Sequence, residues 1–147
     1  MIVYEFRQPT GDIARQLIAL SARWMEEGCC NGMVANQESD LCEPLAVAWD
    51  GTHIVGYAMG HFYCQEKPMS YIKPGSACFS LDELYVLPEY RSQGIGKNLY
   101  RMMEDKVRKN CKYLTLATST KNYKAVLSLY IEELGMDFHS AFLTKQI

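Results

Sequence analysis

The sequence lacks the features of a membrane-spanning, exported or disordered protein. No apolar run approaches the roughly 20 residues that cross a bilayer, so we expect no membrane partner. The N-terminus lacks the basic segment and the long apolar segment of a signal peptide. No repeat, linker or low-complexity tract occurs, and 48% of the residues are hydrophobic, which excludes a wholly disordered chain. We therefore expect a cytoplasmic protein with a single domain over residues 1–147.

The sequence also has little excess charge of either sign. Its 15 lysines and arginines and 17 acidic residues leave a formal net charge of −2. A balance so close to neutral gives no overall electrostatic attraction to a polyanion. We therefore expect no nucleic-acid partner.

Metal-binding and hydrolase motifs are missing as well. The cysteines have no CxxC spacing and the three histidines are scattered, so we expect no metal site and reduced thiols rather than disulfides. No GxSxG sequence occurs, and no recognisable motif places a cysteine as a nucleophile, so a Cys/His hydrolase has little support. The cysteines are Cys29, Cys30, Cys42, Cys64, Cys78 and Cys111.

Hydrophobic periodicity predicts an alternation of strands and helices. Gly28 and Gly135 follow two helical patterns, and Asp50-Gly51 is typical of a tight hairpin turn. We expect an α/β fold with a mixed sheet. The predicted strands cover 2–7, 45–49, 53–63, 79–86, 113–118 and 137–146, and the predicted helices cover 12–27, 95–109 and 122–134.

The most informative segment joins the strand at 79–86 to the helix at 95–109. The connecting turn contains Gly94 and Gly96, so several backbone N–H groups and the helix macrodipole point at one spot that no side chain blocks. Arg91 and Lys97 add positive charge, and together these features suit a pyrophosphate. The turn matches neither the P-loop nor the dinucleotide motif. A flexible turn before an ordinary helix is the alternative.

At this point the sequence resembles the GNAT N-acetyltransferase superfamily. The acetyl-CoA motif of that family matches Arg91-Ser92-Gln93-Gly94-Ile95-Gly96, after a strand that ends Leu84-Tyr85-Val86. A second block, at 122–130 and followed by Gly135, is similar to the N-x-x-A-x-x-x-Y…G-F stretch of the family. The likeness is good over roughly 80–146. Ser92 stands where the family usually has glycine.

The resemblance implies a mostly antiparallel, mixed central sheet flanked by helices, with a splayed parallel strand pair that holds acetyl-CoA. The pantetheine arm would bond to the backbone at Leu84, Tyr85 and Val86, and the Val86 amide would stabilise an oxyanion. The backbone amides of residues 92–97 would hold the pyrophosphate. These residues are Ser92, Gln93, Gly94, Ile95, Gly96 and Lys97.

The resemblance also implies direct attack of a primary amine on acetyl-CoA. Strand alternation places Glu83 toward the cleft, which makes it the candidate base, with Asp82 as the fallback if a bulge shifts the register. Tyr130 would protonate the departing thiolate and contact the cosubstrate. Asn122 would bond the CoA arm or cap its helix. A solvated carboxylate is the alternative for Glu83, and a packed tyrosine is the alternative for Tyr130.

The acceptor is a small molecule or a peptide on this interpretation. Five acidic residues and no basic ones lie in 26–43, so this segment either favours a cationic amine or is an ordinary solvated loop. Homodimers are common in the family, so we expect one by analogy. A non-catalytic acyl-CoA sensor on the same fold is the alternative function.

Overall fold

The computed structural model describes all 147 residues and contains one five-stranded sheet. Neighbouring strands are antiparallel except for β4 and β5, which are parallel. This arrangement confirms the predicted mixed sheet. The strands follow the chain order across the sheet as β1 (Ile2–Phe6), β2 (Leu45–Asp50), β3 (His53–Gln65), β4 (Ser76–Val86) and β5 (Tyr113–Thr115).

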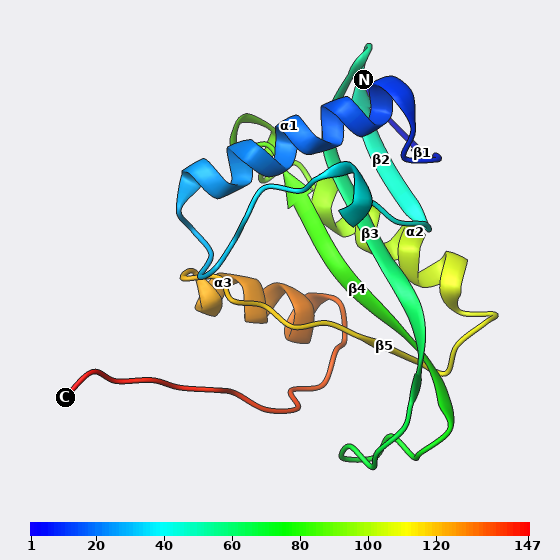
Figure 1. Cartoon of the computed structure of the whole chain (residues 1–147), viewed down its shortest axis with the longest axis vertical. Helices are drawn as coiled ribbons and strands as arrows, with labels where there is room; N and C mark the ends of the chain where they lie inside the picture. The colour runs from blue at the N-terminus through cyan, green and yellow to red at the C-terminus, as the bar shows by residue number, and fades with distance from the viewer.

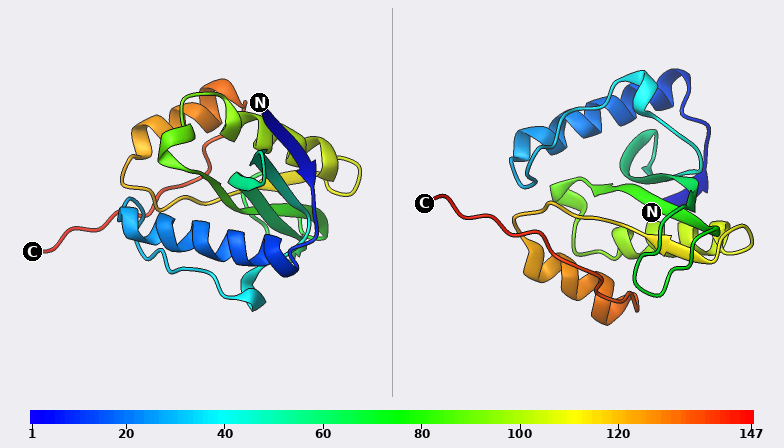
Figure 2. Two further views of the ribbon diagram at one scale, coloured as in Figure 1. Left: turned by 90° about the horizontal axis from the view of Figure 1, so that it is seen from above. Right: turned by 60° about the horizontal axis from the view of Figure 1, so that its bottom comes forward.

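Helices cover both faces of the sheet (Figures 1 and 2). Helix α1 (Gly11–Glu27) lies on one face, while α2 (Ile95–Val107) and α3 (Tyr123–Ser128) lie on the other. The π-helical segment η3 (Leu129–Glu133) continues α3, and short 3₁₀ segments occur at η1 (Glu38–Asp40) and η2 (Pro88–Tyr90). None of the helices combines the length and hydrophobicity needed to traverse a bilayer.

The core forms where the apolar stripes of α1 and α2 meet the sheet. Leu17 of α1 and Leu99 and Met103 of α2 are fully buried, at the helical spacing that the sequence shows. The first four residues of β2 are buried, because β2 lies inside the sheet and helices cover both of its faces (Figure 2). Gly28 ends α1 in the left-handed conformation, with a φ of 61°, as predicted.

A bulge interrupts the pairing of β3 with β4. Met59 faces Glu83 and Gly60 faces Leu81, so Asp82 is an extra residue on β4. A Cβ atom on Gly60 would collide with the Ser80 carbonyl oxygen and the Phe79 ring, so only glycine permits this close approach. The bulge therefore fixes which way the carboxylates of β4 point.

The parallel strands separate soon after they meet. Only three residues of β4, at 78–80, pair with β5, and β5 ends at Thr115 rather than at the predicted residue 118. Beyond this point residues 81–86 of β4 have a neighbour on the β3 side alone. The splay leaves one edge of β4 open inside the fold.

The final strand predicted at 137–146 is wrong. No residue after Met136 belongs to a strand or makes a backbone–backbone hydrogen bond, and the C-terminal segment runs away from the body of the protein (Figure 1). Phe142 and Leu143 are 92% and 88% exposed. The segment has the composition of a strand, but a strand forms only where a partner edge accepts its hydrogen bonds.

Candidate active site

A single large cleft opens where β4 and β5 separate. Its volume is about 950 Å³. Its walls come from the end of α1, the loop at 29–36, the second half of β4, the turn at 90–97, the segment 116–120 and the helix that contains Tyr130. The cleft therefore brings together the two sequence blocks that are about 30 residues apart in the chain.

The glycine turn presents unpaired N–H groups to this cleft. None of the residues 92–97 donates its backbone N–H to another backbone group, because α2 begins at Ile95 and no carbonyl precedes it at the right spacing. Gly94 adopts a φ of 81°, and Ser92 adopts a φ of 63°. The turn is therefore suited to an anion, as the sequence predicts.

The open edge of β4 adds further unpaired groups. Leu87 donates its N–H to the Val55 carbonyl, which sets the alternation of the antiparallel pair. In such a pair every second residue turns its N–H and C=O away from the partner strand. Leu84 and Val86 are therefore the residues whose backbone groups face the gap left by β5.

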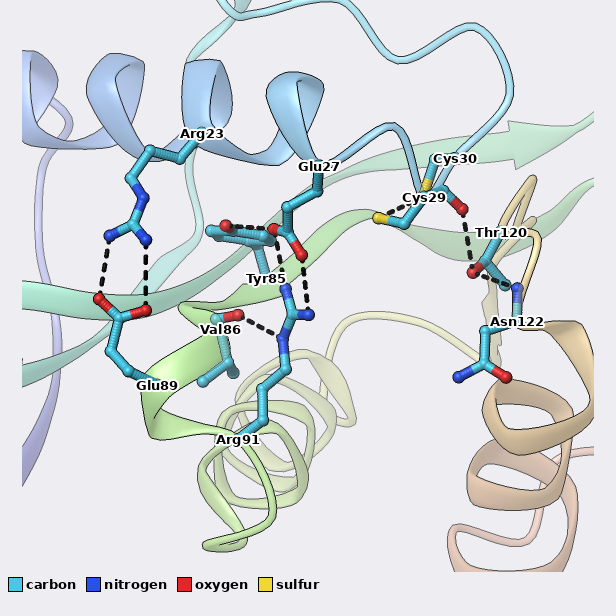
Figure 3. A network of polar contacts seen from close by, with 10 residues as sticks. All are labelled: Arg23, Glu27, Cys29, Cys30, Tyr85, Val86, Glu89, Arg91, Thr120 and Asn122. Atoms are coloured by element: carbon cyan, nitrogen blue, oxygen red, sulfur yellow. Dashed lines mark hydrogen bonds and ion pairs between the residues drawn. The ribbon is translucent and has the colours of Figure 1, made fainter.

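The Arg91 side chain is already engaged in the structure. Its Nε donates to the Val86 carbonyl at 2.9 Å, and its guanidinium forms an ion pair with Glu27 at 2.8 Å (Figure 3). The guanidinium also lies over the Tyr85 ring, which stacks on Trp24. Arg91 therefore joins α1 to the turn, rather than presenting a free positive charge to the anion site as the sequence analysis expected.

Lys97 is likewise paired. Its Nζ lies 3.0 Å from a carboxylate oxygen of Glu133 in η3. This contact ties the start of α2 to the helix that contains Tyr130. The anion site consequently depends mainly on backbone N–H groups, with two cations close by whose charges are balanced by carboxylates.

Glu83 lies in the cleft with three hydrogen bonds to its carboxylate. Asn36 donates from Nδ2 to both oxygens, at 3.0 and 2.8 Å, and the Tyr57 hydroxyl donates at 2.9 Å. Burial raises the pKa of Glu83, although these hydrogen bonds act in the opposite direction. The pKa is thereby moved upward from its usual range, as a group that accepts protons requires.

Asp82, the fallback base, lies beside Glu83 in the cleft lining. One of its oxygens is 2.6 Å from Nδ1 of His61, and the other accepts a hydrogen bond from Ser80. The bulge at this residue separates the two carboxylates into different environments, with Asp82 paired near the surface and Glu83 more deeply placed. Glu83 is the better candidate on this geometry.

Tyr130 and Asn122 both line the cleft. Burial raises the pKa of the Tyr130 hydroxyl to about 12. The Asn122 side chain makes no capping hydrogen bond, so the alternative that it caps α3 is wrong. Asn122 instead donates its backbone N–H to Thr120, and its amide group remains free (Figure 3).

Gln93 and Ile95 differ from their neighbours in the turn. Gln93 is exposed and its side chain is not part of the cleft lining, and Ile95 is 2% exposed and belongs to the hydrophobic core. Any contribution of these two residues to anion binding comes from their backbone N–H groups.

The acidic segment at 26–43 contributes less to the cleft than its composition indicates. Of its five acidic residues, only Asp40 lines the cleft. Glu27 is 21% exposed and is bonded to Arg91 and Tyr85. Together with Asp82 and Glu83 of β4, Asp40 makes one end of the cleft acidic.

Asn36 and Tyr57 are not among the site residues that the sequence predicts. Asn36 bonds Glu83 from a loop 47 positions away in the chain, and Tyr57 bonds it from the adjacent strand, 26 positions away. Tyr57 sits among apolar residues that read as core, and Asn36 lies in a loop without a periodic pattern. No local signal in the sequence marks either residue.

Comparisons with known proteins agree with this geometry. The sequence model of the acetyltransferase (GNAT) family matches residues 14–136. No curated protein matches the chain.

Solved structures with a similar fold cover nearly the whole chain at low identity. An aminoglycoside N-acetyltransferase, AAC(6′)-Iy in complex with CoA, is 14% identical with a TM-score of 0.70, covering 100% of this chain and 96% of that one. A predicted acetyltransferase with acetyl-CoA from Clostridium acetobutylicum is 15% identical with a TM-score of 0.70, with coverage of 99% and 96%. A ribosomal-protein-alanine N-acetyltransferase from Brucella melitensis biovar Abortus 2308 is 17% identical with a TM-score of 0.65, with coverage of 99% and 100%. These likenesses show a shared fold.

Proposed function

This chain belongs to the GNAT acetyltransferase family, and from that premise we propose that it moves an acetyl group from acetyl-CoA to a primary amine. The observation that carries the proposal is the convergence of four features in one cleft. These are the free N–H groups of residues 92–97, the open edge of β4, the carboxylate of Glu83 and the hydroxyl of Tyr130. The acetyltransferase domain is proposed to span residues 1–147.

Acetyl-CoA would lie in the gap between β4 and β5. The N–H groups of Ser92 to Lys97 would hold its diphosphate, and the pantetheine arm would bond to the backbone of Leu84 and Val86 as an added strand. Because Arg91 occupies the Val86 carbonyl, the Val86 N–H is the group left to stabilise negative charge on the thioester oxygen. Asn122, with its free amide, would bond the same arm.

Transfer would proceed by direct attack in a ternary complex. The acceptor amine loses a proton to Glu83, directly or through a water, and its lone pair attacks the acetyl carbonyl carbon. Collapse of the tetrahedral intermediate forms the amide and breaks the carbon–sulfur bond. The thiolate that leaves takes a proton from Tyr130 and departs as free CoA. The positively charged nitrogen of the new amide then gives its extra proton to the Tyr130 phenolate, directly or through a water.

The raised pKa of Tyr130 fits this role only if the pKa of the CoA thiol is raised as well. An ordinary thiol has a pKa near 8.5, about three and a half units below the value of about 12 for Tyr130. Burial raises the pKa of Cys42, a thiol close to Glu83, to about 11. Cys42 lies outside the cleft lining, and desolvation would raise the pKa of a CoA thiol inside the cleft in the same direction, which brings donor and acceptor closer to balance.

Release of free CoA thiol with a panel of amines tests the proposal. The panel comprises a polyamine, an aminosugar and a lysine peptide, together with a neutral hydroxylated compound of similar size. Tyr130→Phe is expected to lower kcat at least tenfold while acetyl-CoA affinity stays within twofold. Tyr100→Phe is the matched control, because Tyr100 is buried beside Tyr130 but does not line the cleft. Equal kcat values for wild type and Tyr130→Phe would remove Tyr130 from the mechanism.

The acceptor is proposed to be a small molecule or a peptide with a positive charge. Asp40, Asp82 and Glu83 place carboxylates at one end of the cleft, which favours an amine that enters as its ammonium form. The neutral hydroxylated compound in the panel should then react poorly. Raising the ionic strength should increase KM for the cationic amines, because salt screens their attraction to the carboxylates.

A non-catalytic acyl-CoA sensor is the competing function. Such a protein would keep the glycine turn without needing a carboxylate of raised pKa in the cleft. Glu83 therefore favours the enzyme. Tight binding of acetyl-CoA with no thiol release across the whole panel would favour the sensor.

A homodimer is proposed on the basis of the exposed C-terminal segment. Residues 138–147 have no backbone partner, and β5 has a neighbouring strand on one side only. The segment of a second copy could supply that partner. Light scattering should then give twice the monomer mass for the full chain and the monomer mass after removal of residues 138–147. We propose a cytoplasmic location for the assembly.

A further inference from the structure

The general base candidate is held in part from a loop outside the sheet. Asn36 lies in the segment 29–44, between α1 and β2. Its Nδ2 is the donor of two of the three hydrogen bonds to Glu83. The third donor, the hydroxyl of Tyr57, comes from β3, which is fixed in the middle of the sheet.

The position of Asn36 is itself fixed by α1. The backbone N–H of Asn36 donates to the hydroxyl oxygen of Ser21 at 2.8 Å, and that hydroxyl donates to the Ile18 carbonyl. Ser21 is fully buried. A buried serine in a helix is favourable only when its hydrogen bonds are made, so this contact anchors the loop at one defined point.

We propose that Asn36 is the positioning residue of the catalytic base: it orients the Glu83 carboxylate and keeps it ionised, and Ser21 holds Asn36 in place for that purpose. The inference rests on the proposed function, in which Glu83 takes the proton from the acceptor amine. It extends that function by giving the segment 29–44 a part in proton transfer from the acceptor amine. Asn36 acts through Glu83 and does not contact the reacting atoms.

The amide suits this task because it donates without carrying charge. Two N–H···O contacts to a carboxylate favour its ionised form, against the burial that favours the protonated form. A lysine or arginine in this position would hold the carboxylate ionised too strongly to accept a proton. The other titratable groups that face Glu83 are Tyr57 on β3, Asp82 on β4, Asp40 on η1 and the Cys42 thiol, and none of them is a cation.

The geometry also makes the protonation of Glu83 sensitive to the position of the segment 29–44. Between its ends the segment is tied by Asn31, whose N–H donates to the Ser119 carbonyl, and by the Asn36 contact with Ser21. Any movement of the loop that breaks the Ser21 contact can withdraw the Asn36 amide, and with it two of the three hydrogen bonds to Glu83. The loop that borders the acceptor end of the cleft therefore controls the protonation of the base.

Titration of the Glu83 side chain by NMR tests this inference without an acceptor. The chain is labelled with 13C at the glutamate carboxyl, and the Glu83→Gln variant identifies the Glu83 signal. Asn36→Ala is expected to raise the pKa of Glu83 by about one unit, the equivalent of one charge-assisted hydrogen bond. Ser21→Ala is expected to raise it by a smaller amount, because it frees the loop but leaves the amide. Val34→Ala, on the same loop but 72% exposed, should leave it unchanged.

Kinetics with the most reactive amine of the panel complete the test. The acid limb of kcat/KM should move to higher pH by the same amount in Asn36→Ala, with KM for acetyl-CoA unchanged. In the Glu83→Gln background, Asn36→Ala should add no further loss. An unshifted Glu83 pKa in Asn36→Ala would overturn this inference and leave the proposed function standing. Full activity of Glu83→Gln would instead overturn the assignment of Glu83 as base.

Discussion

Replacing Glu27 with alanine should destabilise the protein far more than the same change at Glu89. Both carboxylates pair with an arginine across the contact between α1 and the turn that follows β4 (Figure 3). They differ in burial. The side chains of Arg23 and Glu89 are both 50% exposed, whereas the Glu27 side chain is 21% exposed and also accepts a hydrogen bond from the Tyr85 hydroxyl at 2.6 Å.

The expected magnitude follows from these contacts. Tyr85 is 3% exposed, so loss of its acceptor leaves a buried hydroxyl unsatisfied, at a cost of about 2 kcal/mol. The ion pair with Arg91 contributes about 0.5 kcal/mol, because the arginine is half exposed and keeps its bond to the Val86 carbonyl. Alanine regains about 0.4 kcal/mol through its helix propensity. Glu27→Ala should therefore cost about 2 kcal/mol, and Glu89→Ala should cost much less, because solvent screens its exposed ion pair.

Urea unfolding of the two variants and the wild type measures the loss of free energy. Thermal unfolding should show a fall in Tm of roughly 6 °C for Glu27→Ala. The pH dependence gives a second readout. Burial raises the pKa of Glu27, but the hydrogen bonds from Arg91 and Tyr85 outweigh it and hold the pKa below its usual value. The stabilisation is therefore present above the unfolded-state pKa of about 4.3 and is lost as the pH falls through the lower folded-state value. Equal losses for the two variants at pH 7 would refute this reasoning.

Three further substitutions probe the backbone that shapes the cleft. Gly60→Ala should lower the free energy of unfolding by about 3 kcal/mol, because the added Cβ collides with the Ser80 carbonyl oxygen at the bulge. Urea unfolding measures this loss, and a loss below about 1 kcal/mol would contradict the close approach. Gly96→Ala is its control, since a Cβ there lies 3.8 Å from Val86, and stability should stay the same or rise by up to about 1 kcal/mol. Ser92→Gly should raise the free energy of unfolding by about 1 kcal/mol, because Ser92 adopts a φ of 63°, a left-handed conformation that glycine adopts without strain. Acetyl-CoA affinity, measured by calorimetry, should stay unchanged. A destabilised variant would show that the Ser92 side chain makes a contribution of its own.

Local patterns predicted those elements whose stability is decided locally. The apolar spacing of α1 and its terminal Gly28 each have one physical solution, and the structure adopts it. The predicted hairpin also forms, with Gly51 at a φ of 60°, but its loop residues are Gly51 and Thr52, and Asp50 stays in β2. The glycine turn was predictable for the same reason, because free N–H groups at the start of a helix follow from helix geometry alone.

The elements that depend on distant partners could not be predicted in this way. The segment 137–146 has a strand composition but no edge to pair with, and β5 ends early because β4 turns away from it at the bulge. The same limit applies to the site. Glu83 could be placed on the cleft side by alternation, but its donors Asn36 and Tyr57 come from other elements, and the pairing of Arg91 with Glu27 joins residues 64 positions apart.

The central claim is that backbone N–H groups at 92–97 and the open edge of β4 bind acetyl-CoA. An NMR titration of the 15N-labelled chain with CoA tests it most directly. The account predicts that the amide signals of residues 92–97 and of Val86 shift most, and that inorganic pyrophosphate reproduces the shifts at 92–97 but not at Val86. Saturable CoA binding whose largest shifts lie outside the cleft, or the absence of any binding, would contradict it.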